Sequence, residues 1–306
     1  MLNTRNELLK MEKVEMKWLI DGVVPMMAKP IMISGSPGSG KSLLGYQLAS
    51  CVAYGSDFLG CCTSQYNTLY ISYEDDANEL AYRSQQSEKK VNPDGVDGNC
   101  FVMPVSYNYE LTTCKGGKIT KGKDYDSLVN DVNNNEIKLI IIDHLSKIFI
   151  GDENNRNQVN EFGNWLNQLC LDTGAMVVIL AHTNKTDNQY SGSSANAGIY
   201  RMAFVLTMSK QSGERTLSLI KSNCTHNIDP IRFIIDEDLF CSPVAKNQKI
   251  NLVSGATYTR DELCALAGEE MNTRTFSQFA KINNLVKENR KKINGVLKTV
   301  YTVKEN

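Results

Sequence analysis

A glycine-rich segment near the N-terminus has residue types and a spacing that suit the binding of a phosphate. Residues 35–42 read GSPGSGKS and match the pattern G-x-x-x-x-G-K-[ST] in full. Glycine permits backbone conformations that aim several N–H groups at one phosphate, and the N-terminus of the following helix adds partial positive charge. An ordinary glycine-rich turn is the alternative. The pattern predicts that the nucleotide-binding residues are Gly35, Ser36, Pro37, Gly38, Ser39, Gly40, Lys41 and Ser42.

The end of this loop and the end of a later strand together predict a site for ATP with magnesium. Lys41 is expected to reach the β- and γ-phosphates, and the Ser42 hydroxyl is expected to ligate Mg²⁺. Asp143 ends the apolar run LIIID, where P-loop enzymes place an acid in the magnesium shell. The alternative for Asp143 is a buried strand that merely meets solvent at its end. ATP and Mg²⁺ are therefore the expected cofactors.

Three consecutive acids follow another strand, LYISY, and the first of them is a candidate general base. A carboxylate beside the γ-phosphate can orient a water molecule and accept its proton. Acids also stabilise the N-terminus of a helix, which is the alternative role for all three. We assign the base to Glu74, and we expect Asp75 and Asp76 to cap the helix or to support the base.

Three further polar residues lie where they can meet a phosphate. His182 ends the run MVVILAH, and a polar group there can sense the γ-phosphate, although a lone histidine at a strand end is often only structural. Lys221 ends the run RTLSLIK, and Arg201 precedes the run MAFVLTM. Either cation can act on a phosphate of a neighbouring subunit, as arginine fingers do, or remain a solvated surface charge.

These residues need a scaffold that brings strand ends together, and the sequence predicts one. Strands alternate with helices, so the fold should be α/β, with a mostly parallel sheet covered on both faces. Ligands of such sheets bind beyond the carboxyl ends of the strands, where the phosphate loop, both acidic motifs and His182 fall. We expect strands over residues 30–34, 69–73, 101–105, 138–144 and 176–182, three more strands that end at Asp236, and helices over 76–89 and 156–172.

Two polar segments interrupt the alternation. Residues 106–126 are expected to form a long loop or a mobile hairpin, and residues 185–198 a loop. Lysines and tyrosines together suit contacts with phosphates and stacked bases, and a solvated loop is the alternative. In the first segment these residues are Lys115, Lys118, Lys121 and Lys123 with Tyr107 and Tyr109.

The pattern changes after Asp236 and indicates a second, small domain. We expect an ATPase domain over residues 1–240, a linker over 241–256 and a C-terminal domain over 257–306. The last segment has helical patterns over residues 260–267 and 273–288, then a hairpin turn signal at Asn294-Gly295. Its nine basic and six acidic residues give a net charge of +3. Two alternatives are open for this segment. One is a helical domain, of which a winged helix is one form, and the other is a solvated basic tail that packs on the ATPase core or on a partner.

The composition limits the class of protein. The 306 residues, of which 42% are apolar, suit one large α/β domain with a small appendage. A net charge of −1 gives no global attraction to nucleic acid, so any such contact needs a local basic patch. The nine cysteines lack the spacing of metal ligands and indicate reduced thiols. A charged N-terminal segment and the lack of a long apolar stretch predict a cytoplasmic protein without membrane contact.

The motifs taken together resemble the RecA-fold ATPases of the plasmid RepA-type hexameric replicative helicases. The resemblance covers about residues 17–236, and its more specific parts are the acids after the second strand, the stretch after the magnesium strand, and H-T-x-K followed by GSS. The matching segments are WLIDGVVP, GSPGSGKS, ISYEDD, LIIIDHLSKI, GDENNRNQV, ILAHTNK and GSS. The chain departs from the family at Ala181, where a second histidine is common, and at Asn223, where related helicases often have an arginine.

The resemblance implies a ring-shaped hexamer with ATP between subunits and single-stranded DNA in the channel. It implies that Lys41 and Ser42 contact phosphate and magnesium, and that Trp18 lies at the edge of the nucleotide pocket. The remaining implied roles are Glu74 as base, Asp143 as magnesium acid, His182 as γ-phosphate sensor, and Arg201 and Lys221 as trans-acting cations.

We therefore predict ATP-dependent translocation on single-stranded DNA as a replicative helicase. Residues 106–126 and 185–198 would face the channel. The alternative function is a nucleotide-dependent DNA-binding regulator or assembly ATPase that separates no strands, because many RecA-fold proteins use ATP in that way.

Overall fold

The chain forms two compact units, and each is described here by itself. The first comprises Met1–Ile231 with Ile235–Cys241, and the second comprises Arg232–Ile234 with Ser242–Asn306. None of the described helices is long and apolar enough to span a bilayer. The computed structural model describes residues 5–9, 15–107, 109–183, 198–225, 228–244, 252, 256–267, 279–280, 285–293 and 296–303.

A mostly parallel sheet forms the centre of the first unit, as predicted. Among the described residues it has nine strands in the order β13-β12-β11-β10-β3-β9-β8-β4-β5. The strands from β10 to β5 are parallel to their neighbours, whereas β11 runs antiparallel to β10. The bounds are β3 Pro30–Gly35, β4 Thr68–Ser72, β5 Cys100–Met103, β8 Leu139–Asp143, β9 Met176–His182, β10 Met202–Met208, β11 Arg215–Ser222, β12 Ile231–Ile235 and β13 Cys241–Pro243.

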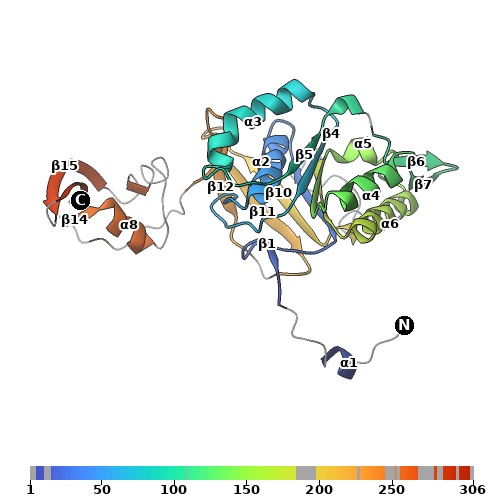
Figure 1. The fold of residues 1–306 in the computed structure, drawn as a ribbon, viewed down its shortest axis with the longest axis horizontal. Helices are drawn as coiled ribbons and strands as arrows, with labels where there is room; N and C mark the ends of the chain where they lie inside the picture. Colours follow the sequence, from blue (N-terminus) through green and yellow to red (C-terminus); the bar gives the residue numbers. More distant parts are fainter. Residues whose placement is uncertain are drawn as a thin grey trace. The chain divides into compact units, whose positions relative to one another are not determined.

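Helices cover both faces of this sheet, which explains its continuous apolar strands. Successive strand residues point to opposite faces. Gly45 of α2 packs on Ile141 and Leu180, whereas Ile140 and Ile142 belong to the core beneath α4 and α6. Figure 1 shows α2 next to the sheet, with α4 and α6 together at another side. The bounds are α2 Lys41–Tyr54, α3 Ala77–Val91, α4 Tyr125–Asn134, α5 Leu145–Ile148 and α6 Arg156–Thr173.

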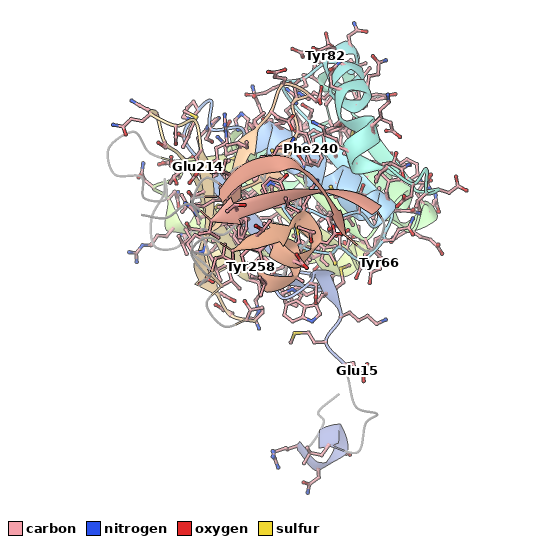
Figure 2. All side chains as sticks on the ribbon, turned by 90° about the vertical axis from the view of Figure 1, so that its left-hand side faces the viewer. Glu15, Tyr66, Tyr82, Glu214, Phe240 and Tyr258 are labelled. Carbon is pink, nitrogen blue, oxygen red and sulfur yellow. The ribbon has the colours of Figure 1, made fainter. Side chains whose placement is uncertain are left out.

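Smaller elements complete the first unit. The helix α3 carries Tyr82 on its outer side, 56% exposed (Figure 2), while Leu80 of the same helix is buried. Two short strands near the N-terminus pair with each other in antiparallel fashion. The bounds of the remaining elements are α1 Arg5–Leu9, β1 Trp18–Ile20, β2 Val24–Pro25 and the 3₁₀ turn η1 Val105–Tyr107.

The segment expected as a loop or mobile hairpin contains a hairpin that is docked on α6. Its strands are β6 (Thr112–Lys115) and β7 (Lys118–Lys121), which pair in antiparallel fashion. The buried Ile119 donates its N–H to Glu161 at 2.8 Å, and Gln158 donates to the carbonyl of Gly117 at 2.9 Å. These contacts with α6 hold the hairpin against the first unit.

In its described residues, the second unit is a small sheet that packs with the helix α8. The strands lie in the order β14-β16-β15, and β16 is antiparallel to both neighbours. Leu263 of α8 packs with Phe279 and Ala280 in a small core. The bounds are β14 Thr257–Thr259, α8 Arg260–Ala267, β15 Leu285–Ile293 and β16 Val296–Val303.

The helix expected over residues 273–288 is wrong at its C-terminal end. Residues from Leu285 onward belong to β15, because they pair with Val300 to Val303 of β16, whose β-branched and aromatic side chains favour a strand. The partners Ile293 and Val296 flank the turn expected at Asn294-Gly295. That turn, residues 273–278 and residues 281–284 lie outside the described part of the chain.

The core beneath α6 gives a prediction about stability. Leu166 is fully buried, whereas Leu171 of the same helix is 63% exposed. We expect Leu166→Ala to lower the free energy of unfolding by about 2–5 kcal/mol, because it leaves a cavity against the sheet. Leu171→Ala should change it by no more than about 0.5 kcal/mol. Urea denaturation monitored by circular dichroism measures both, and equal losses would contradict the assigned burial.

Candidate functional site

The glycine-rich loop joins the end of β3 to the start of α2, and its shape requires glycine at three positions. Gly38 and Gly40 have φ values of 74° and 95°, a region that side chains disfavour. A Cβ on Gly35 would lie 2.7 Å from the carbonyl oxygen of Leu206 in β10. The loop therefore has the backbone that the sequence pattern predicted for holding a phosphate.

Lys41 is the cation at the centre of the site. Its Nζ donates to the carbonyls of Gly35 at 2.9 Å and Ser36 at 3.0 Å, and it lies 3.2 Å from Nδ1 of His182. Parallel pairing of β3 with β9 makes Gly35 the register partner of His182 and so brings the two residues together. Burial lowers the pKa of Lys41 from its ordinary value, and the charges of Asp143 and Glu74 act in the opposite direction.

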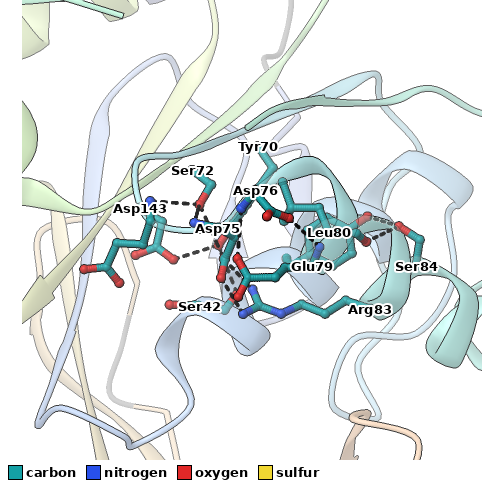
Figure 3. A network of polar contacts seen from close by, with 12 residues as sticks. Ser42, Tyr70, Ser72, Asp75, Asp76, Glu79, Leu80, Arg83, Ser84 and Asp143 are labelled. Atoms are coloured by element: carbon teal, nitrogen blue, oxygen red, sulfur yellow. Dashed lines mark hydrogen bonds and ion pairs between the residues drawn. The ribbon is translucent and has the colours of Figure 1, made fainter. Parts of the chain in front are cut away.

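Asp143 lies at the same edge of the sheet and is held by a tyrosine that sequence reasoning missed. Tyr70 is fully buried, and its hydroxyl donates to Oδ2 of Asp143 at 2.7 Å (Figure 3). The same hydroxyl lies 3.3 Å from the carbonyl oxygen of Ser42. Burial, followed by the charge of Asp143, raises the pKa of Tyr70 well above its ordinary value, so this hydroxyl remains a donor. Tyr70 thus connects the two expected magnesium ligands.

The three acids after β4 have separate partners, as Figure 3 shows for two of them. Asp75 receives two hydrogen bonds from the Arg83 guanidinium, at 2.6 and 2.7 Å. Asp76 caps α3 and forms a capping box with Glu79, which confirms its expected capping role. Glu74 is the acid whose side chain is 52% exposed at the edge of the sheet.

His144 is a second residue of the site that the motifs did not single out. Its Nε2 lies 3.0 Å from Oε1 of Glu74, and its Nδ1 lies 3.1 Å from the hydroxyl of Ser146. Its ring contacts the His182 ring edge to face, with centroids 4.9 Å apart. Burial, then the nearby Lys41 and His144, lowers the pKa of His182, so His182 stays neutral near pH 7. The sequence signal that could have identified His144 was its position directly after Asp143 in the chain.

Arg215 contacts the phosphate loop from β11 and was also missed. Its Nε donates to the carbonyl of Ser39 at 3.0 Å, and its Nη1 donates to the carbonyl of Gly213 at 2.7 Å. The strand β11 runs antiparallel to β10, so its first residue, not its last, lies at the edge that carries the loop. The sequence pattern had singled out only Lys221, at the carboxyl end of this strand.

The two candidate trans-acting cations lie at the opposite edge of the sheet. Lys221 pairs with Ala203, which pairs with Met32 near the start of β3. Its Nζ donates to the carbonyl of Tyr200 at 2.7 Å, and burial together with Arg201 lowers its pKa. The exposed Arg201 donates its backbone N–H to Pro30, the first residue of β3. The chain therefore does not bring either cation to its own phosphate loop.

Two other expected features make none of the contacts described above. Trp18 is half-buried in β1, and its carbonyl accepts a hydrogen bond from Ser64 at 2.6 Å. The second feature is the loop expected over residues 185–198. All of it except residue 198 lies outside the described part of the chain.

The arrangement suits the binding and hydrolysis of a nucleoside triphosphate. A loop of backbone N–H groups and Lys41 meets negative charge, while Ser42 and Asp143 offer the hydroxyl and carboxylate oxygens that Mg²⁺ prefers. Glu74 lies near the same edge with an exposed carboxylate that can accept a proton. The residues present therefore fit ATP with a divalent cation.

Comparisons with known proteins gave a family match and similar solved structures. The profile of the AAA domain family matches residues 2–188. A KaiC-like protein, PH0186 of Pyrococcus horikoshii OT3, is similar with 17% identity and a TM-score of 0.49 over 74% of this chain and 93% of that one. The flagellar accessory protein FlaH of Methanocaldococcus jannaschii is similar with 15% identity and a TM-score of 0.46 over 71% and 89%. A comparison with curated proteins gave no match.

The contact between Arg215 and the loop gives a prediction about nucleotide affinity. Arg215→Ala removes a charge-assisted hydrogen bond that fixes the Ser39 carbonyl. We expect the dissociation constant for ATP to rise about tenfold, the equivalent of about 1.4 kcal/mol. Fluorescence anisotropy with a labelled ATP analogue measures this change. Lys210→Ala, an exposed change beside the same strand, is the control and should leave the affinity unchanged.

Proposed function

The chain belongs to the AAA domain family and is a RecA-like P-loop ATPase, and from this premise we propose that it moves along single-stranded DNA as a RepA-type replicative helicase. The proposal rests on the positions of Arg201 and Lys221. Both lie at the edge of the sheet opposite to the phosphate loop of their own chain. Cations in that position can meet a nucleotide only if it is bound by another copy, which supports a ring of subunits.

The chemistry at each site follows from the residues of one chain. The loop N–H groups and Lys41 bind the β- and γ-phosphates, and Trp18 borders the nucleotide pocket. Ser42 and Asp143 hold Mg²⁺, which supplies charge that neutralises the phosphate oxygens. Glu74 accepts the proton of the attacking water, and His182 senses the γ-phosphate from its position beside Lys41.

Neighbouring subunits complete the site in this proposal. Arg201 or Lys221 of one copy stabilises the charge that develops on the phosphates bound by the next copy. Such an arrangement makes hydrolysis depend on assembly into a homo-oligomer, for which a hexamer is the form that the sequence resemblance implies.

The docked hairpin supports single-stranded DNA as the partner. Lys115, Lys118 and Lys123 are exposed on or beside it, and the nearby Tyr107 is 65% exposed. Lys121 is used within the chain, because its Nζ pairs with Asp172 at 3.4 Å and lies 3.9 Å from the centroid of the Tyr125 ring. Three exposed lysines and an exposed tyrosine suit a nucleic-acid backbone with stacked bases.

The small C-terminal unit has an auxiliary role within this proposal. A helix followed by an antiparallel hairpin is the order of elements in a winged helix, and the hairpin strand β15 contains Lys287, Arg290, Lys291 and Lys292. In the proposal, this hairpin contacts a nucleic-acid backbone. The proposal also keeps the expected domains, with the ATPase domain over residues 1–240, the linker over 241–256 and the C-terminal domain over 257–306.

The proposal predicts ATP turnover that depends on DNA. We expect single-stranded DNA to raise the ATPase rate at least about fivefold and the protein to unwind a forked duplex while ATP lasts. Glu74→Gln should bind ATP and DNA but hydrolyse ATP only at a small residual rate, because an amide cannot accept the proton. Lys41→Ala should not bind ATP, because it lacks the charge that offsets the phosphates.

Two outcomes would overturn parts of this proposal. Slow turnover with stable DNA complexes and no unwinding would favour the nucleotide-dependent regulator or assembly ATPase. Hydrolysis by Glu74→Gln at the rate of the unchanged protein would show that Glu74 is not the base.

A mixing experiment tests the shared site. Lys41→Ala subunits and Lys221→Ala subunits are each expected to be inactive when assembled alone. Mixing them should restore part of the ATPase rate, because some interfaces then combine an intact loop with an intact Lys221. The same mixture with Arg201→Ala identifies which cation acts. If no mixture recovers ATPase activity, and the rate per subunit of the unchanged protein does not depend on protein concentration, each chain hydrolyses ATP by itself.

A further inference from the structure

His144 connects the candidate base to the rest of the site. It is 6% exposed, and its Nε2 lies 3.0 Å from Oε1 of Glu74. Glu74 is 52% exposed at the side chain, and without a partner a glutamate so placed can adopt several rotamers. The contact with the buried ring therefore restricts the position of the carboxylate.

The surrounding hydrogen bonds select one tautomer of the His144 ring. Nδ1 lies 3.1 Å from the hydroxyl of Ser146, which can donate to it. Nε2 then carries the hydrogen and donates to the Glu74 carboxylate, which accepts only. In this tautomer both ring nitrogens have partners, and the ring has one orientation in which both contacts are made.

The His144 ring is also fixed from the side of the phosphate loop. Its neighbour is the ring of His182, at a centroid distance of 4.9 Å and an interplanar angle of 68°. His182 in turn lies 3.2 Å from Nζ of Lys41. Two histidine rings therefore form a continuous set of contacts between the cation that meets the phosphates and the acid that meets the water.

We propose that His144 is a positioning residue that orients Glu74 for proton abstraction from the attacking water. A general base must lie within hydrogen-bond reach of the proton that it removes, and the base is commonly oriented by a third group. His144 is that group here, acting through Nε2 and held in place by Ser146 and His182. This inference deepens the proposed function, because it rests on Glu74 as the base.

The test compares two amides at position 144. The amide nitrogen of glutamine reaches about as far as Nε2 of histidine, whereas that of asparagine reaches only about as far as Nδ1. We expect His144→Asn to lower kcat by about 10- to 100-fold, because the carboxylate loses its fixed position. His144→Gln should recover most of that loss. Affinity for a labelled ATP analogue and the unfolding midpoint should change little in either variant, and Lys147→Ala is an exposed control in α5.

Adding His144→Asn to the Glu74→Gln variant separates a positioning role of His144 from a general packing effect. In Glu74→Gln the residual rate no longer depends on the base, so adding His144→Asn should lower it no further. A further loss in that background would overturn the proposal. Equal losses from the glutamine and asparagine variants, or an unchanged kcat in His144→Asn, would also overturn it.

The comparison of kcat between the His144 variants can be made without DNA. If the unchanged protein hydrolyses ATP but is not stimulated by single-stranded DNA, the helicase proposal fails and the comparison of His144 variants still stands. If DNA stimulates hydrolysis and His144→Asn keeps its full rate, the positioning role fails and the helicase proposal still stands.

Discussion

The parallel pairing of four neighbouring strands is the constraint on which the site depends. Because β3, β9, β8 and β4 run in the same direction, their last residues reach one edge of the sheet. The register pairs Gly35 with His182 and Ser72 with Asp143. Lys41 and His182 thereby come within 3.2 Å although they are 141 residues apart in the chain. The apolar interior of these strands, buried on both faces, fixes this alignment, and the polar ends follow from it.

Three charged side chains at this edge have partners within the chain. Lys41 donates to two loop carbonyls, Asp143 accepts from Tyr70, and Glu74 accepts from His144. Burying a charge is costly unless it has partners, so these contacts keep the site stable in the form described here. Under the proposed function, a phosphate that enters the loop would compete with the carbonyls of Gly35 and Ser36 for the Lys41 ammonium. Because His182 also contacts that ammonium, the exchange would change the surroundings of the histidine pair.

The antiparallel strand β11 relates two regions of the sheet that are far apart. Arg215 at its start donates to the phosphate loop, and Lys221 near its end lies at the opposite edge. Six residues of extended strand separate their Cα atoms by roughly 20 Å. One rigid element thus carries a residue for the chain's own loop and a candidate for a neighbour's nucleotide.

The sequence alone determined the parallel strands of the first unit and the residues at their ends. The glycine pattern, the apolar runs and the acids that end them predicted the loop at 35–42, Asp143 and the mostly parallel sheet, because these features depend on local composition and period. It also gave capping of the next helix as one of two roles for Asp75 and Asp76, and Asp76 has that role. Each of these signals lies within a few residues of the feature that it predicts.

Only the tertiary structure decided which other side chains meet at the site. Tyr70 follows the strand pattern as a core residue, Arg215 begins a strand, and His144 follows the acid Asp143, so none has a local signal for its contact. The end of the second C-terminal helix was wrong for the same reason, because Leu285 is in a strand through pairing with Val303. Contacts of this kind depend on strand order, direction and register, which are set by packing between segments far apart in the chain.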